Sequence, residues 1–453
     1  MSRLNPVDVG MPAGCRADKA GSAVGFEGIH VKLPRTAHDC PRCGRPMTGH
    51  GNLTKHMAHA VGSAPCRLTV TVPRSGCKKC GITVSEEVTF ASAVSANATE
   101  ALEVRVVGLL GQRSTVKEAA ALCGVPYDTV RLVIDGVHVN RPKLPRVLLM
   151  DEAHAYSYRE PDTGKQVAVY WTCAYDGEDG KLVDMVEGHD SEALDQWYSQ
   201  FSAGERNKVR AFCSDMYDPF LNAAAKWLPL AVRAVDRFHV AKDGVAHMDE
   251  ARRRIQKGAG NGASIKRRAR KLAVNCGKRA REHAGEAWAE HEKRVTCDVP
   301  CVCDEKHSQL RQAYLVLQLY YEWQDKPWDD RQACDKALCD LIMKASGIPV
   351  PEMAAFASTV NDYRQQLVTG AVEHINSARA ESANDKIKEL KKRGRGFGGF
   401  AETRKRLLIA FGKPGAMELL TVRKRRLAAI EAREAEAREK AAAKRKRGKR
   451  KRR

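Results

Sequence analysis

The stretch that decides the fold of this chain runs from residue 147 to residue 188. It contains three segments rich in β-branched and aromatic residues, which are VLLMDEA (147–153), KQVAVYWTCAYD (165–176) and KLVDMVEG (181–188). Turn-forming residues separate them, and this pattern predicts three β-strands.

The segments that follow alternate between helix and strand. DSEALDQWYSQF (190–201) reads as a helix capped by Asp190 or Ser191. VRAFCSDM (209–216) reads as a strand, DPFLNAAAKWL (218–228) as a helix and VRAVDRF (232–238) as a short strand. Three strands followed by helix, strand, helix and strand predict a mixed α/β domain.

The flanking regions differ in character. Residues 1–35 are rich in Gly, Ala and Pro without a clear period, which predicts a mostly irregular segment. RPKLPR (141–146) reads as a linker, and residues 240–375 as a charged, cysteine-containing helical region. The end of the chain, from Glu431, reads as a polar helix that runs into a disordered basic end.

Composition and charge narrow the class of protein. The 453 residues carry a net charge of +22 and are 43% hydrophobic, which excludes wholesale disorder. The basic run KRKRGKRKRR (444–453) and the basic body both favour a polyanion such as nucleic acid, although a merely soluble basic protein remains the simpler alternative. There is no transmembrane run and no signal-peptide core, so we expect a cytoplasmic protein that makes no contact with a membrane.

Two CxxCG motifs lie near the N-terminus, at Cys40–Cys43 and Cys77–Cys80. Zn²⁺ takes four thiolate or imidazole ligands in a tetrahedron, so the pairs predict a structural zinc site within residues 36–90. A redox pair is the alternative. His56, His59 and Cys66 lie between the motifs and could replace a ligand or form a second site, or be ordinary loop residues.

Residues 98–140 contain a helix–turn–helix pattern. Val116–Cys123 and Tyr127–Val133 read as helices joined by Gly124, and small alanines allow the helices to approach closely. Thr129 and Arg131 could then face the major groove of DNA. A purely structural helical hairpin has the same pattern, and the neighbouring zinc module and the positive charge favour DNA binding.

Acidic side chains follow two of the predicted strands. Asp151 comes after VLLM and Asp215 after VRAFCS, where a carboxylate is costly unless it is solvated or binds a cation. Two such aspartates on neighbouring strands, joined by a glutamate from a helix, can hold two Mg²⁺ ions for phosphodiester chemistry. Either aspartate could instead be a strand-end cap or a surface group.

Glu381 is the best third acid. It opens the basic helix ESANDKIKELKKRG (381–394), in which Asn384 and Lys388 share its face at i+3 and i+7. Such a helix could bind metal and hold DNA phosphates together, through Asn384, Lys388, Lys391, Lys392 and Arg393. The alternative is a solvated charged helix.

The ordered blocks LLMDEAHAYSYR, FCSDMYDPF, LPLAVRAVDRFHV and ESANDKIKELKKRGRGFGGFAETRKRLL resemble the transposases of the ISL3 insertion-sequence family over about residues 36–412. The resemblance implies a DDE transposase with a ribonuclease-H-like catalytic fold. It also implies that Asp151, Asp215 and Glu381 are the metal-binding triad.

The same resemblance gives roles to further residues. Asp236 and His239 match an Asp-x-x-His signature of related groups and are auxiliary residues, although Asp236, at a strand end, is also a rival for the second metal ligand. Glu152 should point to the opposite face of its strand from Asp151 and is left out. The long interval between Asp215 and Glu381 implies a helical insertion domain. Within it we consider a second zinc site, at Cys297, Cys301, Cys303 and His307.

Taken together, these features predict a multidomain α/β transposase with Mg²⁺ (or Mn²⁺) at the catalytic site and structural Zn²⁺. Its partners would be double-stranded DNA, both transposon ends and target, and a second copy of the chain in a dimer or higher oligomer in the bacterial cytoplasm, associated with the nucleoid. The alternatives are a DNA-binding regulator with an inactive ribonuclease-H-like domain and a nuclease that does not transpose. The predicted parts are a zinc module (36–90), a helix–turn–helix domain (98–140), a catalytic core in two pieces (145–240 and 376–422), a helical insertion (241–375) and a basic helical tail (423–453).

Overall fold

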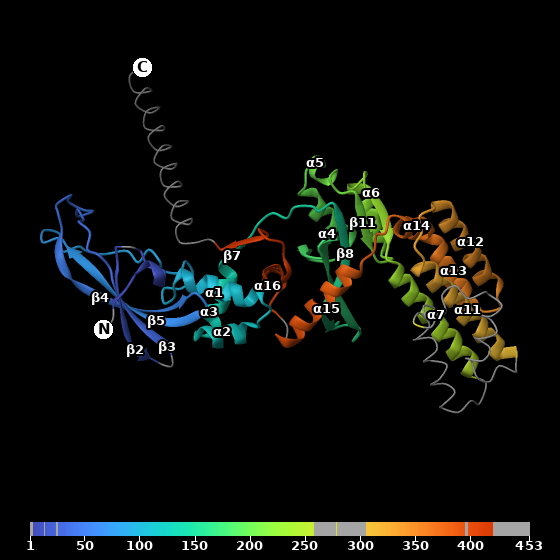
Figure 1. Ribbon diagram of the computed structural model, residues 1–453, viewed down its shortest axis with the longest axis horizontal. Helices are drawn as coiled ribbons and strands as arrows, with labels where there is room; N and C mark the ends of the chain where they lie inside the picture. Colours follow the sequence, from blue (N-terminus) through green and yellow to red (C-terminus); the bar gives the residue numbers. More distant parts are fainter. Residues whose placement is uncertain are drawn as a thin grey trace, which may run out of the picture. The chain divides into compact units, whose positions relative to one another are not determined.

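The computed structural model describes residues 3–12, 14–23, 26–257, 278, 305–394 and 397–419. The chain divides into two compact units (Figure 1). The first contains Met1–Arg141 and Lys386–Arg453, and the second contains Pro142–Asp385. The boundary between Asp385 and Lys386 falls inside the helix α15 (Ala378–Arg393), so the described residues after it belong to the first unit.

A six-stranded sheet occupies the N-terminal part of the first unit. Its strands are β1 (Arg3–Leu4), β2 (Arg16–Ala23), β3 (Phe26–Lys32), β4 (Thr48–Val61), β5 (Ala64–Gly76) and β6 (Thr83–Ser85), with a 3-10 turn at Val7–Val9. The order is β1-β2-β3-β5-β4, and β6 pairs with β5. Alternate side chains such as Val31, Leu68 and Val70 are buried, which provides the core of this sheet.

The prediction that residues 1–35 are irregular is wrong. β2 is rich in Gly and Ala and carries little strand signal of its own. It forms because β3 pairs with it on one side and pairs in parallel with β5 on the other. The partner β5, which fixes β3 in the sheet, lies about forty positions from β3 in the sequence, where no local pattern reveals it.

A helical module completes the first unit. Its elements are α1 (Glu100–Gly111), α2 (Val116–Cys123), α3 (Tyr127–Gly136), α16 (Phe400–Phe411) and the small ribbon of β7 (Val137–Val139) with β13 (Met417–Leu419). Thr115 and Glu118 form a capping box at the start of α2. Gly124, with φ of 60°, ends α2 in the left-handed conformation that permits the turn into α3.

Arg406 of α16 is fully buried in this module. Its guanidinium donates to the carbonyl oxygen of Ser114 at 2.8 Å and lies 5.6 Å from the ring centre of Phe397. Burial lowers the pKa of Arg406 to about 10. A buried cation bonded to main-chain carbonyls ties the C-terminal helix to the end of α1, and α16 packs against both α1 and α3.

The second unit is built on a five-stranded sheet. Its strands are β8 (Val147–Arg159), β9 (Gln166–Asp176), β10 (Leu182–Val186), β11 (Ala211–Ser214) and β12 (Val232–Val235), in the order β10-β9-β8-β11-β12. β8, β9 and β10 are antiparallel, whereas β11 runs parallel to both β8 and β12. The helices between these strands are α4 (Ser191–Ser199), α5 (Ala203–Arg206) and α6 (Asp218–Trp227). The mixed α/β architecture predicted from the sequence is confirmed.

Helices follow the last strand of this sheet. They are α7 (Arg237–Lys257), α11 (Glu305–Asp325), α12 (Arg331–Gly347), α13 (Pro351–Asp362), α14 (Arg364–Val372) and α15 (Ala378–Arg393). α7, α11, α12 and α13 pack side by side (Figure 1), around residues such as Tyr320 and Phe356. The described part of the region 241–375 is thus helical.

Two predictions fall on residues outside the described ranges. Cys297, Cys301 and Cys303 are among them, and of their proposed partner His307 only the backbone, in α11, is described. The basic tail 423–453 is also outside these ranges. Within the described residues, no helix combines the length and apolar character that crossing a lipid bilayer requires.

Candidate functional site

Three aspartates lie in step across the parallel part of the five-stranded sheet. β11 pairs with β8 so that Cys213 lies opposite Leu149, and two residues further Asp215 follows in step with Asp151. β11 pairs with β12 so that Ser214 lies opposite Val235, which brings Asp236 to the next position of the same row. Parallel pairing with this register therefore brings the three acids into one row, which we call the acidic row. Asp215 and Asp236 follow the ends of their strands, whereas Asp151 lies inside β8, which continues to Arg159.

Asp215 has a carboxylate oxygen without a partner. Its Oδ1 is buried and accepts no hydrogen bond from any described residue. Burial, and then the charges of Glu152 and Asp151, raise the pKa of Asp215 to about 6. A buried, crowded carboxylate is stabilised by a cation, so this oxygen is a candidate metal ligand.

Asp236 is occupied by contacts within the protein. Its Oδ1 accepts from the backbone N–H of Phe238 at 3.2 Å, which caps α7. Its Oδ2 lies 2.8 Å from Nδ1 of His239 and accepts from the hydroxyl of Ser377 at 2.5 Å. Although burial opposes ionisation, the hydrogen bonds from His239 and Ser377 bring the pKa of Asp236 below its ordinary value. Of the two rivals for the second ligand, Asp215 is the one with a free oxygen.

His239 belongs to the same acidic site. Its hydrogen bond to Asp236, and in addition the charges of Asp151 and Asp215, raise its pKa. The acidic row therefore favours the protonated form of the ring that lies beside it.

α15 is attached to the strand that carries Asp151. The Asn384 amide donates to Oδ2 of Asp151 and accepts from the hydroxyl of Tyr175 on β9. Asn384 is 3% exposed. Glu381 is half-buried and lies one turn before Asn384 on the same helix. The two hydrogen bonds of Asn384 therefore hold the turn that carries Glu381 against the sheet.

This position alters the role expected of Asn384. The sequence offers it as a DNA contact beside Lys388, yet Asn384 is buried with both amide ends engaged, whereas Lys388 is exposed. An amide without solvent access does not suit direct contact with a DNA strand. Its contacts instead orient Asp151.

Sequence reasoning missed a group on the other face of β8. Glu152 lies with its Oε1 2.8 Å from Nδ1 of His189, and the His189 ring stacks on Tyr217 with centres 5.1 Å apart. Glu152 also raises the pKa of Asp215, so its charge acts on the acidic row. His189 and Tyr217 come from loops after β10 and β11, and the sequence gives no spacing that links them.

The four cysteines of the two CxxCG motifs come together. The sulfur atoms of Cys40, Cys43, Cys77 and Cys80 all lie within 4.8 Å of one another. The two motifs turn alike: the backbone N–H of Gly44 donates to Cys40 and that of Gly81 to Cys77, and both glycines have φ of 67°. This cluster could bind one zinc ion with four thiolates. In the described residues, no other group of three or more Cys, His, Asp or Glu side chains is as compact.

The cysteine and histidines between the motifs have structural contacts. His59 is buried and its ring nitrogens lie 2.8 Å from the hydroxyl of Thr99 and 2.9 Å from the carbonyl oxygen of Val9. Cys66 faces His59 across the β4–β5 pair, and His56 lies further along β4. None of the three joins the four-cysteine cluster.

The residues expected to contact DNA lie in varied settings. Thr129 is half-buried, and Lys392 is exposed. Arg131 pairs with Glu402 of α16 at 3.0 Å, and Arg393 with Glu118 at 3.1 Å. Lys391 is half-buried. Exposed pairs of this kind contribute little to stability and can exchange partners, so these arginines remain accessible to phosphate.

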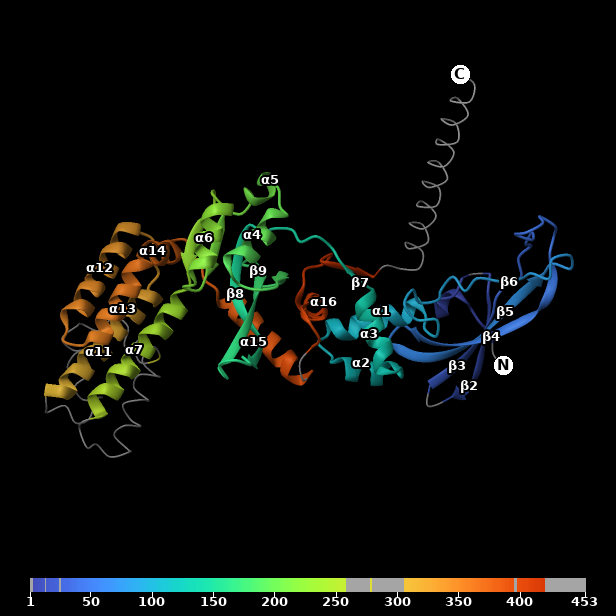
Figure 2. The same cartoon turned by 180° about the vertical axis from the view of Figure 1, so that it is seen from behind.

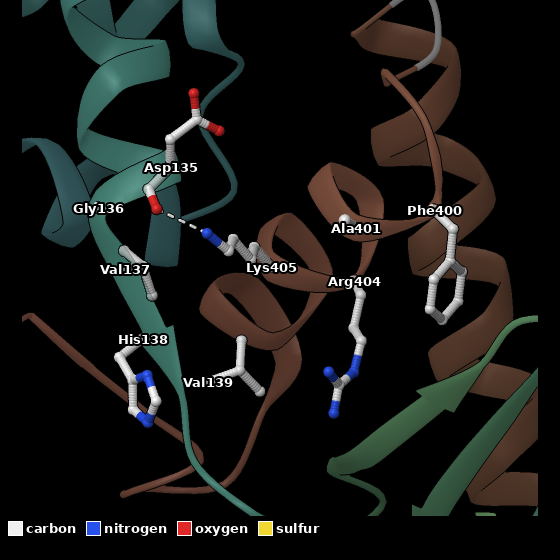
Figure 3. A pocket seen from close by; sticks show the side chains of 9 residues that line it. All are labelled: Asp135, Gly136, Val137, His138, Val139, Phe400, Ala401, Arg404 and Lys405. Atoms are coloured by element: carbon white, nitrogen blue, oxygen red, sulfur yellow. Dashed lines mark hydrogen bonds between the residues drawn. The ribbon is translucent and has the colours of Figure 1, made fainter. Parts of the chain in front are cut away.

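A pocket of about 380 Å³ lies in the same helical module (Figure 3). The end of α3, strand β7 and the start of α16 line it, and His138, Arg404 and Lys405 are its basic side chains. Nζ of Lys405 donates to the carbonyl oxygen of Asp135 at 2.6 Å. The remaining lining is the acidic Asp135 and apolar side chains such as Val137 and Phe400, so the pocket is mixed in character.

Comparison with known proteins adds one finding to this geometry. A family model described as a transposase, of the ISL3 group of DDE transposases, matches residues 150–407. The matched interval is more than half of the chain and includes the acidic row and α15. No curated protein matches the chain. The family match and the arrangement of the acids agree, and the chain is a member of the ISL3 transposase family.

Proposed function

We propose that this transposase binds the terminal inverted repeats of its insertion sequence and cuts and joins DNA strands with Mg²⁺ (or Mn²⁺) at Asp151, Asp215 and Glu381. The observation that carries the proposal is the in-step placement of Asp151 and Asp215, with a buried, unpartnered oxygen on Asp215. The order β10-β9-β8-β11-β12, three antiparallel strands followed by two parallel ones, supports a ribonuclease-H-like core.

The donor set fits a hard divalent cation. Carboxylate oxygens are the ligands that Mg²⁺ prefers, and Asp215 offers one that no described residue has taken. At such a site Mg²⁺ would supply two effects, a lower pKa for an attacking water and stabilisation of charge on the leaving oxygen of a phosphodiester.

The protein's own residues prepare this site. Asn384 and the backbone N–H of Glu152 fix the two oxygens of Asp151. His239, favoured in its protonated form, would attract the phosphate of the DNA, and Asp236 orients its ring. The 3′-hydroxyl freed by cleavage would attack the target strand in line, so that one phosphodiester bond breaks as another forms.

The first unit would recognise the transposon ends. We assign end binding to the four-cysteine zinc module and to α2 and α3 as a helix–turn–helix, with Thr129, Arg131, Lys391, Lys392 and Arg393 as candidate contacts. His138 and Arg404 of the small pocket suit backbone phosphates. Because two ends must be joined in one reaction, the active form is at least a dimer.

The proposed domain boundaries shift with the fold. The zinc module (36–90) becomes part of a sheet that begins with β1, and the predicted second piece of the core (376–422) is divided, with α16 in the first unit. We keep residues 145–240 as the proposed first piece of the catalytic core and 241–375 as its proposed helical insertion.

The experiment that tests the proposal incubates purified full-length protein with its element's end DNA and Mg²⁺. We expect nicking at the end of the repeat and joining to a target plasmid, both lost in Asp151→Asn. Binding without cleavage would instead indicate a regulator. Cleavage without end specificity or joining would indicate a nuclease.

Asn384→Ala should separate catalysis from DNA binding. The change removes the amide that holds Asp151 and leaves Tyr175 without its partner, so we expect cleavage to fall at least about tenfold. End-DNA affinity, measured by fluorescence anisotropy, should change by less than about twofold. Asp385→Asn, at the exposed neighbouring position, is the control and should leave both values unchanged. An equal loss of affinity and rate in Asn384→Ala would return this residue to a DNA-contact role.

A further inference from the structure

The hairpin of β8 and β9 continues well past the acidic row. Figure 2 shows the two strands side by side. β8 runs eight residues beyond Asp151 to Arg159, and a turn leads back into β9 at Gln166. The backbone N–H of Glu160 donates to the carbonyl oxygen of Lys165 at 2.9 Å, which closes the turn. The acidic site therefore has a defined arm beside it.

A register shift within this hairpin decides which side chains share a face with Asp151. Asp151 lies opposite Cys173, and Tyr156 lies opposite Val169. Cys173 and Val169 are four residues apart on β9, so they point to the same face. β8 holds one additional residue in this interval, since the register shifts between His154 and Tyr156. The shift puts Tyr156 on the face of Asp151; uninterrupted alternation would put it on the opposite one.

Tyr158 follows on the same face, opposite Val167. The rings of Tyr156 and Tyr158 have centres 6.5 Å apart, and the two residues are 54% and 46% exposed. Closer to the acids the same face is covered, because Ala153 and Trp171 are 8% and 6% exposed. The face thus opens into two adjacent, half-exposed aromatic rings as it leaves the acidic row.

We propose that Tyr156 and Tyr158 form a stacking surface for unpaired bases of the DNA end that is cut at the acidic row. Aromatic rings bind single-stranded nucleic acid by stacking on bases, largely without regard to sequence. Bases within a duplex are already stacked and are not accessible to these rings. The turn carries Arg159 and Lys165 but also Glu160 and Asp162, so its charges balance and stacking, not phosphate attraction, would provide the binding.

This inference rests on the proposed function and is tested apart from catalysis. Full-length Asp215→Asn protein is mixed with end DNA that carries 2-aminopurine in a short unpaired segment at the cleavage position, and with a fully paired version. Stacking on a tyrosine quenches 2-aminopurine fluorescence. We expect quenching, and affinity for the unpaired DNA that falls about tenfold or more on adding Tyr156→Ala and Tyr158→Ala. Affinity for paired DNA should not change.

Two matched variants complete the test. Tyr156→Phe with Tyr158→Phe keeps both rings and should keep the quenching, and Ser157→Ala changes the opposite face of the same strand and should have no effect. If the double alanine protein does not fold, each single alanine variant is used instead. No loss, or an equal loss on paired and unpaired DNA, overturns the proposal. So does a change in oligomeric mass with equal losses, which would make the rings a contact between copies. Any of these results would leave the proposed cleavage of DNA by the wild-type protein unaffected, because that activity is measured separately.

Discussion

Asp215→Asn should abolish DNA cleavage and at the same time make the metal-free protein more stable. The substitution removes the oxygen donor that we assign to Mg²⁺, so we expect end cleavage to fall by at least about a thousandfold. It also removes a half-buried charge crowded by Glu152 and Asp151. A substitution at a structural residue would lower stability. A substitution that abolishes cleavage but raises the stability of the metal-free protein therefore indicates a metal ligand.

The gain in stability of Asp215→Asn over the wild-type protein should grow as the pH rises. In the folded metal-free protein the pKa of Asp215 is raised from 3.8 to about 6, so the folded state holds the proton more tightly than the unfolded chain. Above pH 6 the ionised carboxylate therefore lowers the free energy of unfolding by about 3 kcal/mol. Asp215→Asn should restore this free energy of unfolding at pH 7–8, and the difference from the wild-type protein should disappear towards pH 4. Thermal unfolding in Mg²⁺-free buffer measures it.

Two controls make this result specific. Adding Mg²⁺ should stabilise the wild-type protein and not Asp215→Asn. Asp236→Asn should instead lower stability, by about 1–3 kcal/mol, because Asp236 caps α7 and accepts bonds from His239 and Ser377. If Asp236→Asn abolished cleavage while Asp215→Asn retained it, the two aspartates would have to exchange roles.

Cys77→Ser should remove one zinc ion per chain and with it the binding of transposon ends. The four sulfur atoms form a closed set of ligands, and structural zinc contributes on the order of 10 kcal/mol to the folding of such sites. The two CxxCG motifs lie just before β4 begins and just after β5 ends. Loss of the zinc ion should therefore disorder this end of the sheet. We expect affinity for end DNA to fall at least about a hundredfold.

The measurement is zinc content by mass spectrometry, with end binding by anisotropy. Because a second zinc site at residues 297–307 remains a prediction, the informative quantity is the difference between wild type and variant. Cys66→Ala is the matched control, since Cys66 is buried in the same sheet outside the cluster and should keep the zinc. Equal zinc in wild type and Cys77→Ser would contradict the four-cysteine site.

Several parts of the candidate site could be predicted from local sequence. Asp151 follows an apolar run within β8, and Asp215 follows the apolar strand β11. Cys40, Cys43, Cys77 and Cys80 form two CxxCG motifs with the spacing of zinc ligands. These signals are local because a strand end or a two-residue turn is defined by its immediate neighbours. Glu381 is selected from its place at the start of a basic helix, and the family resemblance assigns it to the metal-binding triad. The family match over residues 150–407 confirms the family but leaves the roles of the three acids to experiment.

Other parts could not be predicted because they depend on contacts between distant segments. The burial of Asn384 follows from Tyr175 and Asp151, which are more than two hundred positions away. The pairing of Glu152 with His189 joins a strand to a loop beyond the next two strands. Periodicity places a side chain on one face of its own element, but it does not say what covers that face.

The sequence by itself determined the mixed α/β class, the four-cysteine cluster and the position of Asp215 after its strand, because each follows from short-range periodicity or spacing. The expected strand end at Asp151 is wrong, because β8 continues to Arg159 through its pairing with β9. Only the tertiary structure decided that β2 is a strand and that α16 packs with α1 and α3. It also decided that, among the described residues, one oxygen of Asp215 has no hydrogen-bond partner, whereas both oxygens of Asp236 have one. It also decided, by a single register shift in β8, which face Tyr156 occupies. Each of these depends on the partner across a sheet or a core, and that partner is fixed by folding of the whole unit.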